Sequence, residues 1–129
     1  MKLYRPTDRI TIKIGDATFS VSPLTYDQKI EVQTIISEGS SGYKITPKAI
    51  YDSSLLALRY GLKEVSGIDD FELDIKDGVV TEESAKDLLY AEENEAILTS
   101  CNLVATGKFT YLPEGVEIIN PKKKGKRKK

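Results

Sequence analysis

The sequence predicts an α+β fold. An N-terminal antiparallel β-hairpin, with room for a third strand, packs with three main α-helices, and a basic flexible tail follows. Three observations predict it: apolar and polar residues alternate on both sides of Gly15-Asp16, three later segments begin with helix-capping residues, and residues 122–129 contain seven Lys or Arg side chains. We therefore expect a single α+β domain over 1–110 and a tail over 111–129.

The hairpin prediction covers residues 10–21. Ile10, Ile12 and Ile14 alternate with polar residues, which is the spacing of a half-buried strand. Gly15-Asp16 is a two-residue turn signal. If Ile14 pairs with Ala17, the apolar side chains of the second strand fall on the same face as those of the first.

Two helices are expected next. The first runs over 26–38, with Thr25 and Gln28 as a capping box, Tyr26 and Ile30 along its buried side and Gly39 as its end. The second begins at Pro47 after the capping residue Thr46 and ends near Gly61 or Leu62. Its expected buried stripe contains Ile50, Tyr51, Leu55, Leu58 and Leu62.

The third strand and the third helix are less regular. Phe71, Leu73 and Ile75 alternate with acidic residues, which indicates a short strand or extended edge segment before the turn 76–78. Thr81 caps a helix predicted over 82–105, with a candidate break at the acidic stretch 92–95. Gly107 ends this helix, and only 108–112 could form a later strand.

The charge is unevenly distributed along the chain. Seven of the 19 basic residues lie in 122–129, so 12 basic residues face 20 acidic ones in the remainder, a balance of −8. Proteins that bind duplex nucleic acid carry positive charge on the folded surface that meets phosphate, and an acidic body would repel it. The basic tail could instead fold back on the acidic body.

Compartment and membrane contact are judged from the same composition. The single cysteine, Cys101, cannot form an internal disulfide, and the N-terminal stretch lacks the apolar core of a signal peptide. No apolar run approaches the about 18 residues that cross a bilayer. We therefore expect a cytoplasmic protein without a membrane partner.

The residue types argue against catalysis and cofactors. The chain has no histidine, which removes the commonest general base and metal ligand. Asp70, Glu72 and Asp74 have the spacing of calcium-loop ligands, but the required glycine is replaced by Ile75. No Gly-rich phosphate loop is present, and nothing singles out two of the acids as a catalytic pair. We expect no enzyme activity, no cofactor, no metal site and no catalytic residue.

Two features keep alternative interpretations. Cys101 occupies an apolar helix position, so a buried inert thiol is favoured over a reactive one. The tail is either a solubilising end or an electrostatic contact for nucleic acid or an acidic protein surface. The residues of that candidate contact are Lys122, Lys123, Lys124, Lys126, Arg127, Lys128 and Lys129.

A family resemblance arises from the stretches "ITIKIGDATFSVSPLTYDQKIEVQ" and "KAIYDSSLLALRYGLKEVSGI". A hairpin ending in Pro-Leu-Thr before a polar helix, followed by a helix ending in Leu-Lys-Glu-Val-Ser-Gly, resembles the tail assembly chaperones of long-tailed bacteriophages. The resemblance spans roughly 8–106 and rests on the order of elements. It implies a non-enzymatic helper in the host cytoplasm, absent from the mature virion, that binds the tape measure protein and recruits tail tube subunits.

The resemblance also bears on the basic tail. Many genes of this family shift reading frame near their 3′ end and give a longer second product, which would be a further partner. Codons for Lys122-Lys123-Lys124 could form the A-rich slippery sequence, so the lysines would partly reflect a constraint on the messenger. Two other functions stay open: a small nucleic-acid-associated protein that uses the tail, and a structural tail component of the virion.

Overall fold

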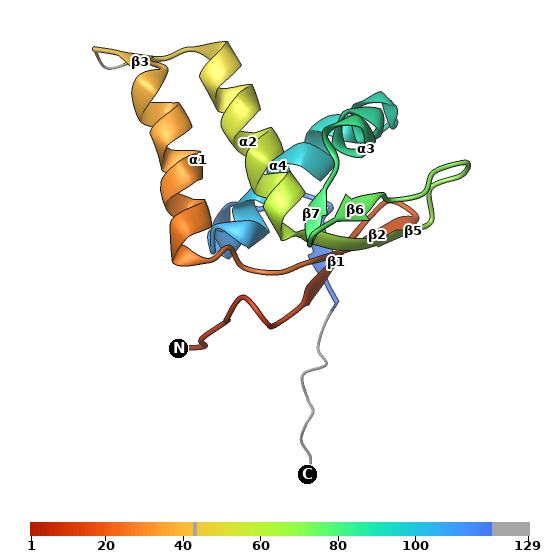
Figure 1. Cartoon of the computed structure of the whole chain (residues 1–129). Helices are drawn as coiled ribbons and strands as arrows, with labels where there is room; N and C mark the ends of the chain where they lie inside the picture. The colour runs from red at the N-terminus through yellow and green to blue at the C-terminus, as the bar shows by residue number, and fades with distance from the viewer. Residues whose placement is uncertain (43, 120–129) are drawn as a thin grey trace.

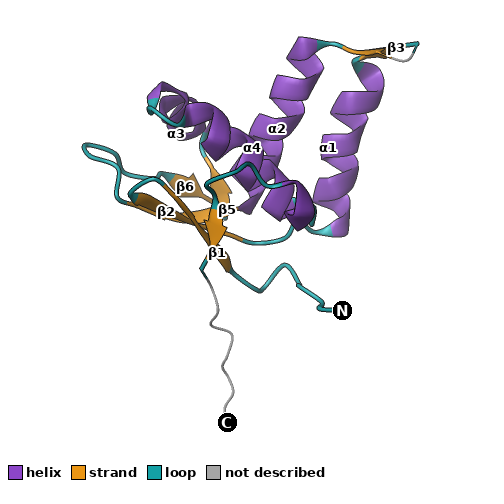
Figure 2. Ribbon diagram, turned by 180° about the vertical axis from the view of Figure 1, so that it is seen from behind, coloured by secondary structure: helices purple, strands orange, loops and turns teal. Residues whose placement is uncertain are grey.

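The computed structural model describes residues 1–42 and 44–119 and has a mixed α+β architecture (Figure 1). Within these residues the main sheet is antiparallel and has the strand order β5-β2-β1-β8. Figure 2 shows the helices gathered on one side of this sheet. Two small two-stranded sheets complete the described part, β3 with β4 and β6 with β7.

The elements follow in chain order, with η marking short 3₁₀ helices. They are β1 (Ile10–Ile14), β2 (Ala17–Val21), α1 (Tyr26–Glu38), β3 (Ser40–Ser41), β4 (Lys44–Ile45), α2 (Pro47–Gly61), β5 (Leu62–Ser66), β6 (Ile75–Lys76), β7 (Val79–Val80), α3 (Glu82–Asp87), η1 (Leu88–Tyr90), α4 (Asn94–Ala105), η2 (Phe109–Tyr111) and β8 (Glu117–Ile118).

The predicted hairpin is confirmed with its register. Ile10 pairs with Val21, Ile12 with Phe19 and Ile14 with Ala17, so the apolar side chains of both strands share one face. All six are buried, whereas the opposite face carries Ser and Thr side chains. The sheet is therefore apolar on the side that meets the helices and polar on the other.

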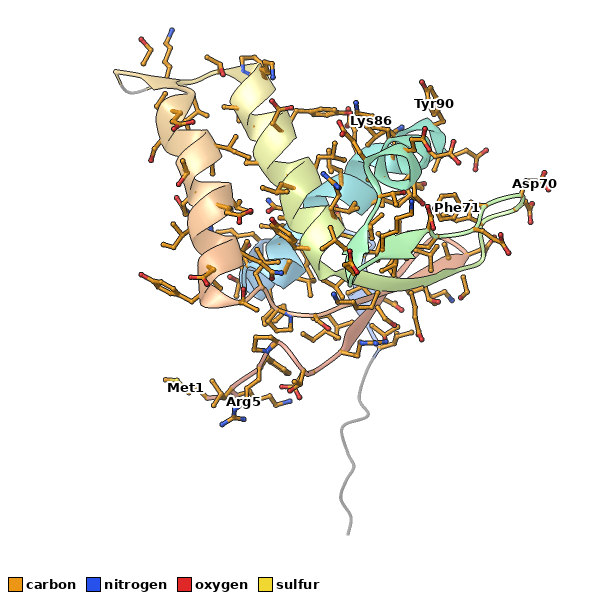
Figure 3. The ribbon with its side chains drawn as sticks, in the orientation of Figure 1. Met1, Arg5, Asp70, Phe71, Lys86 and Tyr90 are labelled. Atoms are coloured by element: carbon orange, nitrogen blue, oxygen red, sulfur yellow. The ribbon has the colours of Figure 1, made fainter. Side chains whose placement is uncertain are left out.

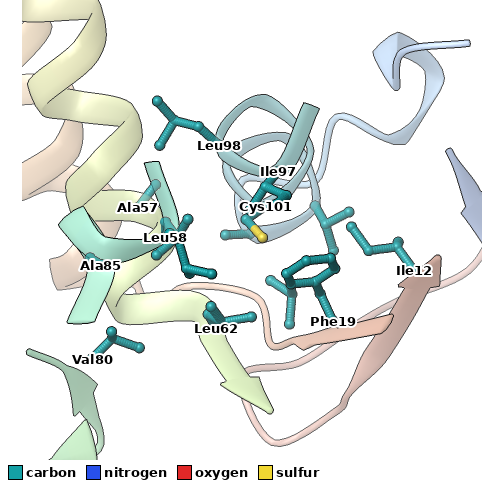
Figure 4. Packing of buried hydrophobic residues seen from close by; sticks show 14 of the residues in the cluster. Ile12, Phe19, Ala57, Leu58, Leu62, Val80, Ala85, Ile97, Leu98 and Cys101 are labelled. Carbon is teal, nitrogen blue, oxygen red and sulfur yellow. The ribbon is translucent and has the colours of Figure 1, made fainter. Parts of the chain in front are cut away.

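The core lies between this apolar face and α4. Figure 4 shows Cys101 and Ile97 of α4 next to Phe19 and Ile12 of the sheet, with Leu58 of α2 beside them. Phe19, Ile12, Leu58 and Cys101 are all fully buried. The C-terminal half of α2 thus belongs to the core, because it packs between α4 and the sheet.

The ends of α2 and α4 meet closely beside the sheet. A β-carbon added at Gly61 would lie 2.8 Å from the β-carbon of Ala105 and 3.1 Å from a methyl group of Val21. The connection from β2 to α1 crosses this point, where Ser22 donates a backbone hydrogen bond to Gly61 and Leu24 donates one to Ala105. These bonds fix the start of α1 relative to the core.

Several predicted helix features are confirmed. α1 spans the predicted 26–38, and Thr25 and Gln28 exchange both hydrogen bonds of the capping box. Thr46 and Thr81 cap α2 and α3 through their side chains. The third predicted helix is divided as the acidic stretch suggested, because α3 and η1 end at Tyr90 and α4 begins at Asn94.

The predicted buried faces of the first two helices are wrong. Val32 is the buried residue of α1, whereas Tyr26 and Ile30 are exposed. α2 buries the small residues Ala49, Ser53, Ala57 and Gly61 together with Leu58, and leaves Ile50 and Tyr51 largely exposed. Small side chains let neighbouring helix backbones approach, so contact distance and not apolar character selects the buried face here.

The strand predictions after residue 61 need correction. The chain turns directly from α2 into β5, which pairs with β2 and was not expected. The expected strand over 71–75 is reduced to β6, although Phe71 and Leu73 are half-buried and Glu72 and Asp74 exposed as predicted. Asp77 and Gly78 have the positive φ angles of a hairpin turn between β6 and β7.

The predicted boundary between domain and tail is also wrong. Residues 109–111 form η2 and not a strand, and β8 adds Glu117 and Ile118 to the edge of the main sheet beside β1. The backbone N–H of Ile119 donates to the carbonyl of Thr11. The folded body therefore extends at least to Ile119, because Ile118 supplies an apolar side chain that turn residues 113–115 had hidden from the sequence pattern.

Candidate functional site

The described residues offer little that could carry catalysis. They contain no group of three or more His, Cys, Asp or Glu side chains that could hold a metal ion. Cys101 is buried as favoured, and burial raises the pKa of its thiol to about 12. Across 1–42 and 44–119, no helix is long and apolar enough to cross a membrane. The features with chemical content are surfaces, of which three stand out.

The first surface is the hairpin of helices α1 and α2, which projects from the body (Figure 1). α1 packs mainly against α2 and buries Val32 there. The phenol of Tyr60 donates a hydrogen bond to the carboxylate of Glu31 across the same contact, and this bond raises the pKa of Tyr60. α1 is thus a peripheral helix attached along one side.

The outer face of α1 carries two large apolar side chains. Tyr26 and Ile30 are one turn apart, are 76% and 47% exposed, and lie on the opposite side of the helix from Val32. Ile50 and Tyr51 of α2, with Ile45 just before it, are exposed near the far end of the hairpin. We call Tyr26, Ile30, Ile45, Ile50 and Tyr51 the hairpin apolar residues.

A groove lies between α1 and α3 over one side of α2. It has a volume of about 390 Å³, and Ile35, Leu55 and Leu56 supply its apolar lining. The ion pairs Lys48–Asp52 and Lys86–Glu82 stand at its rim, and Arg59 crosses to donate a hydrogen bond to the carbonyl of Val80. This groove gives the hairpin a second apolar strip that is framed by charges of both signs.

The second surface is an acidic end. Residues 69–95 contain 11 acidic residues and two lysines. A pocket of about 360 Å³ opens here, with Ile14, Ala17 and Ile97 among its apolar lining and Asp16, Asp69, Glu92 and Glu93 among its polar lining. Tyr90 stands beside these acids and is 88% exposed. The predicted acidic exposed segment 69–77 therefore joins a wider acidic surface with one prominent aromatic side chain.

The third surface lies at the opposite end of the molecule. Figure 3 shows Met1 and Arg5 far from Asp70 and Tyr90. A pocket of about 430 Å³ is lined there by Lys2, Tyr4, Ile10, Gly107, Phe109 and Ile118. The rings of Tyr4 and Phe109 meet edge to face with their centroids 5.4 Å apart. We call this mainly apolar cavity the terminal pocket.

The predicted electrostatic contact residues, Lys122 to Lys124 and Lys126 to Lys129, lie outside the described residues. The structure shows only where that segment starts, because Ile119 follows directly after Ile118 of the terminal pocket. Tyr43, expected to pack on the core, also lies outside the described residues.

Sequence reasoning missed all three surfaces as surfaces. The exposed hairpin apolar residues were assigned to the core, and the terminal pocket depends on β8, which was assigned to the tail. The available signal was the run of small residues at 49, 53, 57 and 61, since it marks the contact face of α2 and leaves Ile50 and Tyr51 outside. The acidic end could be predicted, because it is a local excess of charge.

Comparisons with known proteins give no match: no protein-family model, curated protein or solved structure is significantly similar to this chain.

Proposed function

We propose that this protein is a non-enzymatic assembly helper of the phage tail chaperone type, which binds an apolar helical segment of the tape measure protein with its α1–α2 hairpin. The observation that carries the proposal is the packing of α1. This helix buries Val32 and presents Tyr26 and Ile30 to solvent. An apolar face left open on a peripheral helix is typical of proteins that bind another helix.

The charge of the body suits the same role. An excess of eight negative charges outside residues 122–129 keeps a chaperone soluble while its apolar side chains stay exposed. It also repels phosphate, which argues against the alternative of nucleic-acid binding by the body. That alternative depends on residues 122–129 alone. The proposed location is the host cytoplasm, with tail tube subunits as further partners and no place in the mature virion.

Coexpression tests the proposal. A tape measure fragment that is insoluble alone should become soluble with this protein and with a form truncated after Ile119. It should stay insoluble with the double variant Tyr26→Ser/Ile30→Ser. Both side chains are exposed, so the variant keeps the fold, and circular dichroism checks this. A matched control is Gln33→Ser/Ser37→Ala, on the same outer face of α1 but without apolar groups.

Nucleic-acid binding predicts a different pattern. Affinity for a DNA or RNA duplex would disappear on truncation after Ile119 and fall steeply with salt in the full chain. A truncated form that loses the fragment, together with a double variant that keeps it, contradicts the hairpin proposal. The gene neighbourhood gives an independent check, because the proposal expects a tube gene upstream and a very long coiled-coil gene downstream.

A further inference from the structure

We propose that copies of this chain associate head to tail, with Tyr90 of one copy inserted into the terminal pocket of the next. The occupant of the pocket is thus a second copy of this protein. The inference goes beyond client binding by the hairpin and does not use the hairpin apolar residues.

The donor side is the acidic end. Tyr90 is the last residue of η1 and is 88% exposed, which is unusual for a large aromatic side chain. Asp87, Glu92 and Glu93 are exposed close to it in the chain. A protruding tyrosine among charged groups has the form of an interface anchor, because tyrosine supplies a large contact area at a small entropy cost.

The acceptor side is the terminal pocket. Its volume of about 430 Å³ exceeds that of an aromatic ring, and its lining is mainly apolar. Lys2 is part of the lining, and Arg5, Arg9 and Lys108 belong to the two segments that form the pocket. Ile118 at its edge precedes residues 122–129, with seven further basic residues. The pocket therefore combines an apolar floor with an excess of positive charge.

Charge complementarity selects the second copy as the occupant. The acidic end has nine more acidic than basic residues over 69–95, and the basic segments flank the pocket at the opposite end (Figure 3). Opposite charges at two ends favour a head-to-tail orientation and disfavour contacts between identical ends. The basic residues 122–129 then have a role in the protein, as an electrostatic collar for the neighbouring acidic end.

The contact is heterologous, because two different surfaces meet. Such contacts build rings or open helical filaments and do not stop at a dimer unless a ring closes. A head-to-tail array places successive α1–α2 hairpins at regular intervals. This geometry would suit a client that is long and helical, which links the inference to the proposed function without depending on it.

Sedimentation velocity of the full chain across a concentration series is the test. The native protein should form dimers and larger species as concentration rises, and 0.5 M salt should shift it toward monomer because exposed charges are screened. Tyr90→Ala and Ile118→Glu should each weaken association by roughly tenfold or more, since each removes one half of a central contact. Lys2→Glu is a second pocket variant that changes charge on an exposed side chain, and Tyr26→Ala is the control.

Mixing the variants gives the sharpest outcome. Tyr90→Ala keeps an intact pocket and Ile118→Glu keeps an intact tyrosine, so an equimolar mixture should form one-to-one pairs that grow no further. A native protein that stays monomeric, a Tyr90→Ala variant that associates like the native protein, or a mixture that stays monomeric overturns the proposal. Because no client is present in this experiment, its failure leaves the hairpin proposal unaffected.

Discussion

Gly39 and Ala49 lie where helices α1 and α2 meet at the end of their hairpin, and a β-carbon on Gly39 would stand 2.2 Å from the β-carbon of Ala49. The backbone N–H of Thr46 donates to the carbonyl of Gly39 at 3.0 Å and closes the same junction. Gly39 has a negative φ of −92°, so the reason for glycine here is space and not backbone conformation. This contact sets how closely the two helices pack.

Gly39→Ala should therefore destabilise the protein by about 1–3 kcal/mol, the usual cost of overpacking. Ala49→Gly removes the opposing β-carbon and should cost about 1 kcal/mol by its lower helix propensity. The double variant should be less destabilised than the two single effects added together, because each substitution makes room for the other. Urea unfolding of all four proteins measures this coupling, and simple additivity would show that the two residues do not touch.

α1 should open more readily than α2 and α4. Its contribution to the core is Val32, whereas α2 and α4 each bury at least five residues in the described part. Hydrogen exchange should be faster in 29–38 than in 53–61 and 97–105. Thr25→Ala removes the capping bond to Gln28, should cost about 1 kcal/mol, and should increase exchange in α1 alone. Equal protection of all three helices would contradict a peripheral α1.

Ser100 and Ser84 should respond in opposite ways to alanine. The hydroxyl of Ser100 is fully buried and has no hydrogen-bond partner among the described residues. Ser100→Ala should stabilise the protein by up to about 1 kcal/mol, since an unpaired buried polar group is removed. The hydroxyl of Ser84 accepts a bond from the backbone N–H of Asp74 at 3.1 Å, so Ser84→Ala should destabilise by about 1 kcal/mol. Thermal unfolding of both variants gives the comparison.

Cys101 should be unreactive in the native protein. Its side chain is fully buried, and burial raises the pKa of the thiol from 9.0 to about 12, so the reactive thiolate is scarce at pH 8. A disulfide reagent should modify Cys101 at the rate of protein unfolding and independently of reagent concentration once the reagent is in excess. Fast modification that is proportional to reagent would show that the thiol is accessible.

Local signals in the sequence predict the local structure well. Alternation on both sides of Gly15-Asp16 fixed the register of β1 and β2, and the caps Thr25, Thr46 and Thr81 fixed the starts of three helices. These features depend on residues that are close in the chain, so no knowledge of distant contacts is needed. The same holds for the acidic end, which is a local excess of charge.

The candidate surfaces depend on distant contacts and could not be predicted. Ile50 and Tyr51 have the spacing of a buried stripe, but the short helix α4 covers only the C-terminal half of α2, and α1 packs on its small residues. β5 and β8 carry mixed sequences that form strands only because the edges of β2 and β1 are available to them. Tertiary context overrides local propensity at these places.

The most direct test of the central claim is the affinity of the protein for an apolar helical segment of the neighbouring tape measure protein, measured by titration calorimetry. Tyr26→Ser/Ile30→Ser should weaken binding by roughly tenfold or more while the urea midpoint stays within error, because two exposed anchors are lost and no core contact changes. The control Gln33→Ser/Ser37→Ala should bind like the native protein. Equal affinity of the native protein and the Tyr26→Ser/Ile30→Ser variant would contradict a client site on the outer face of α1.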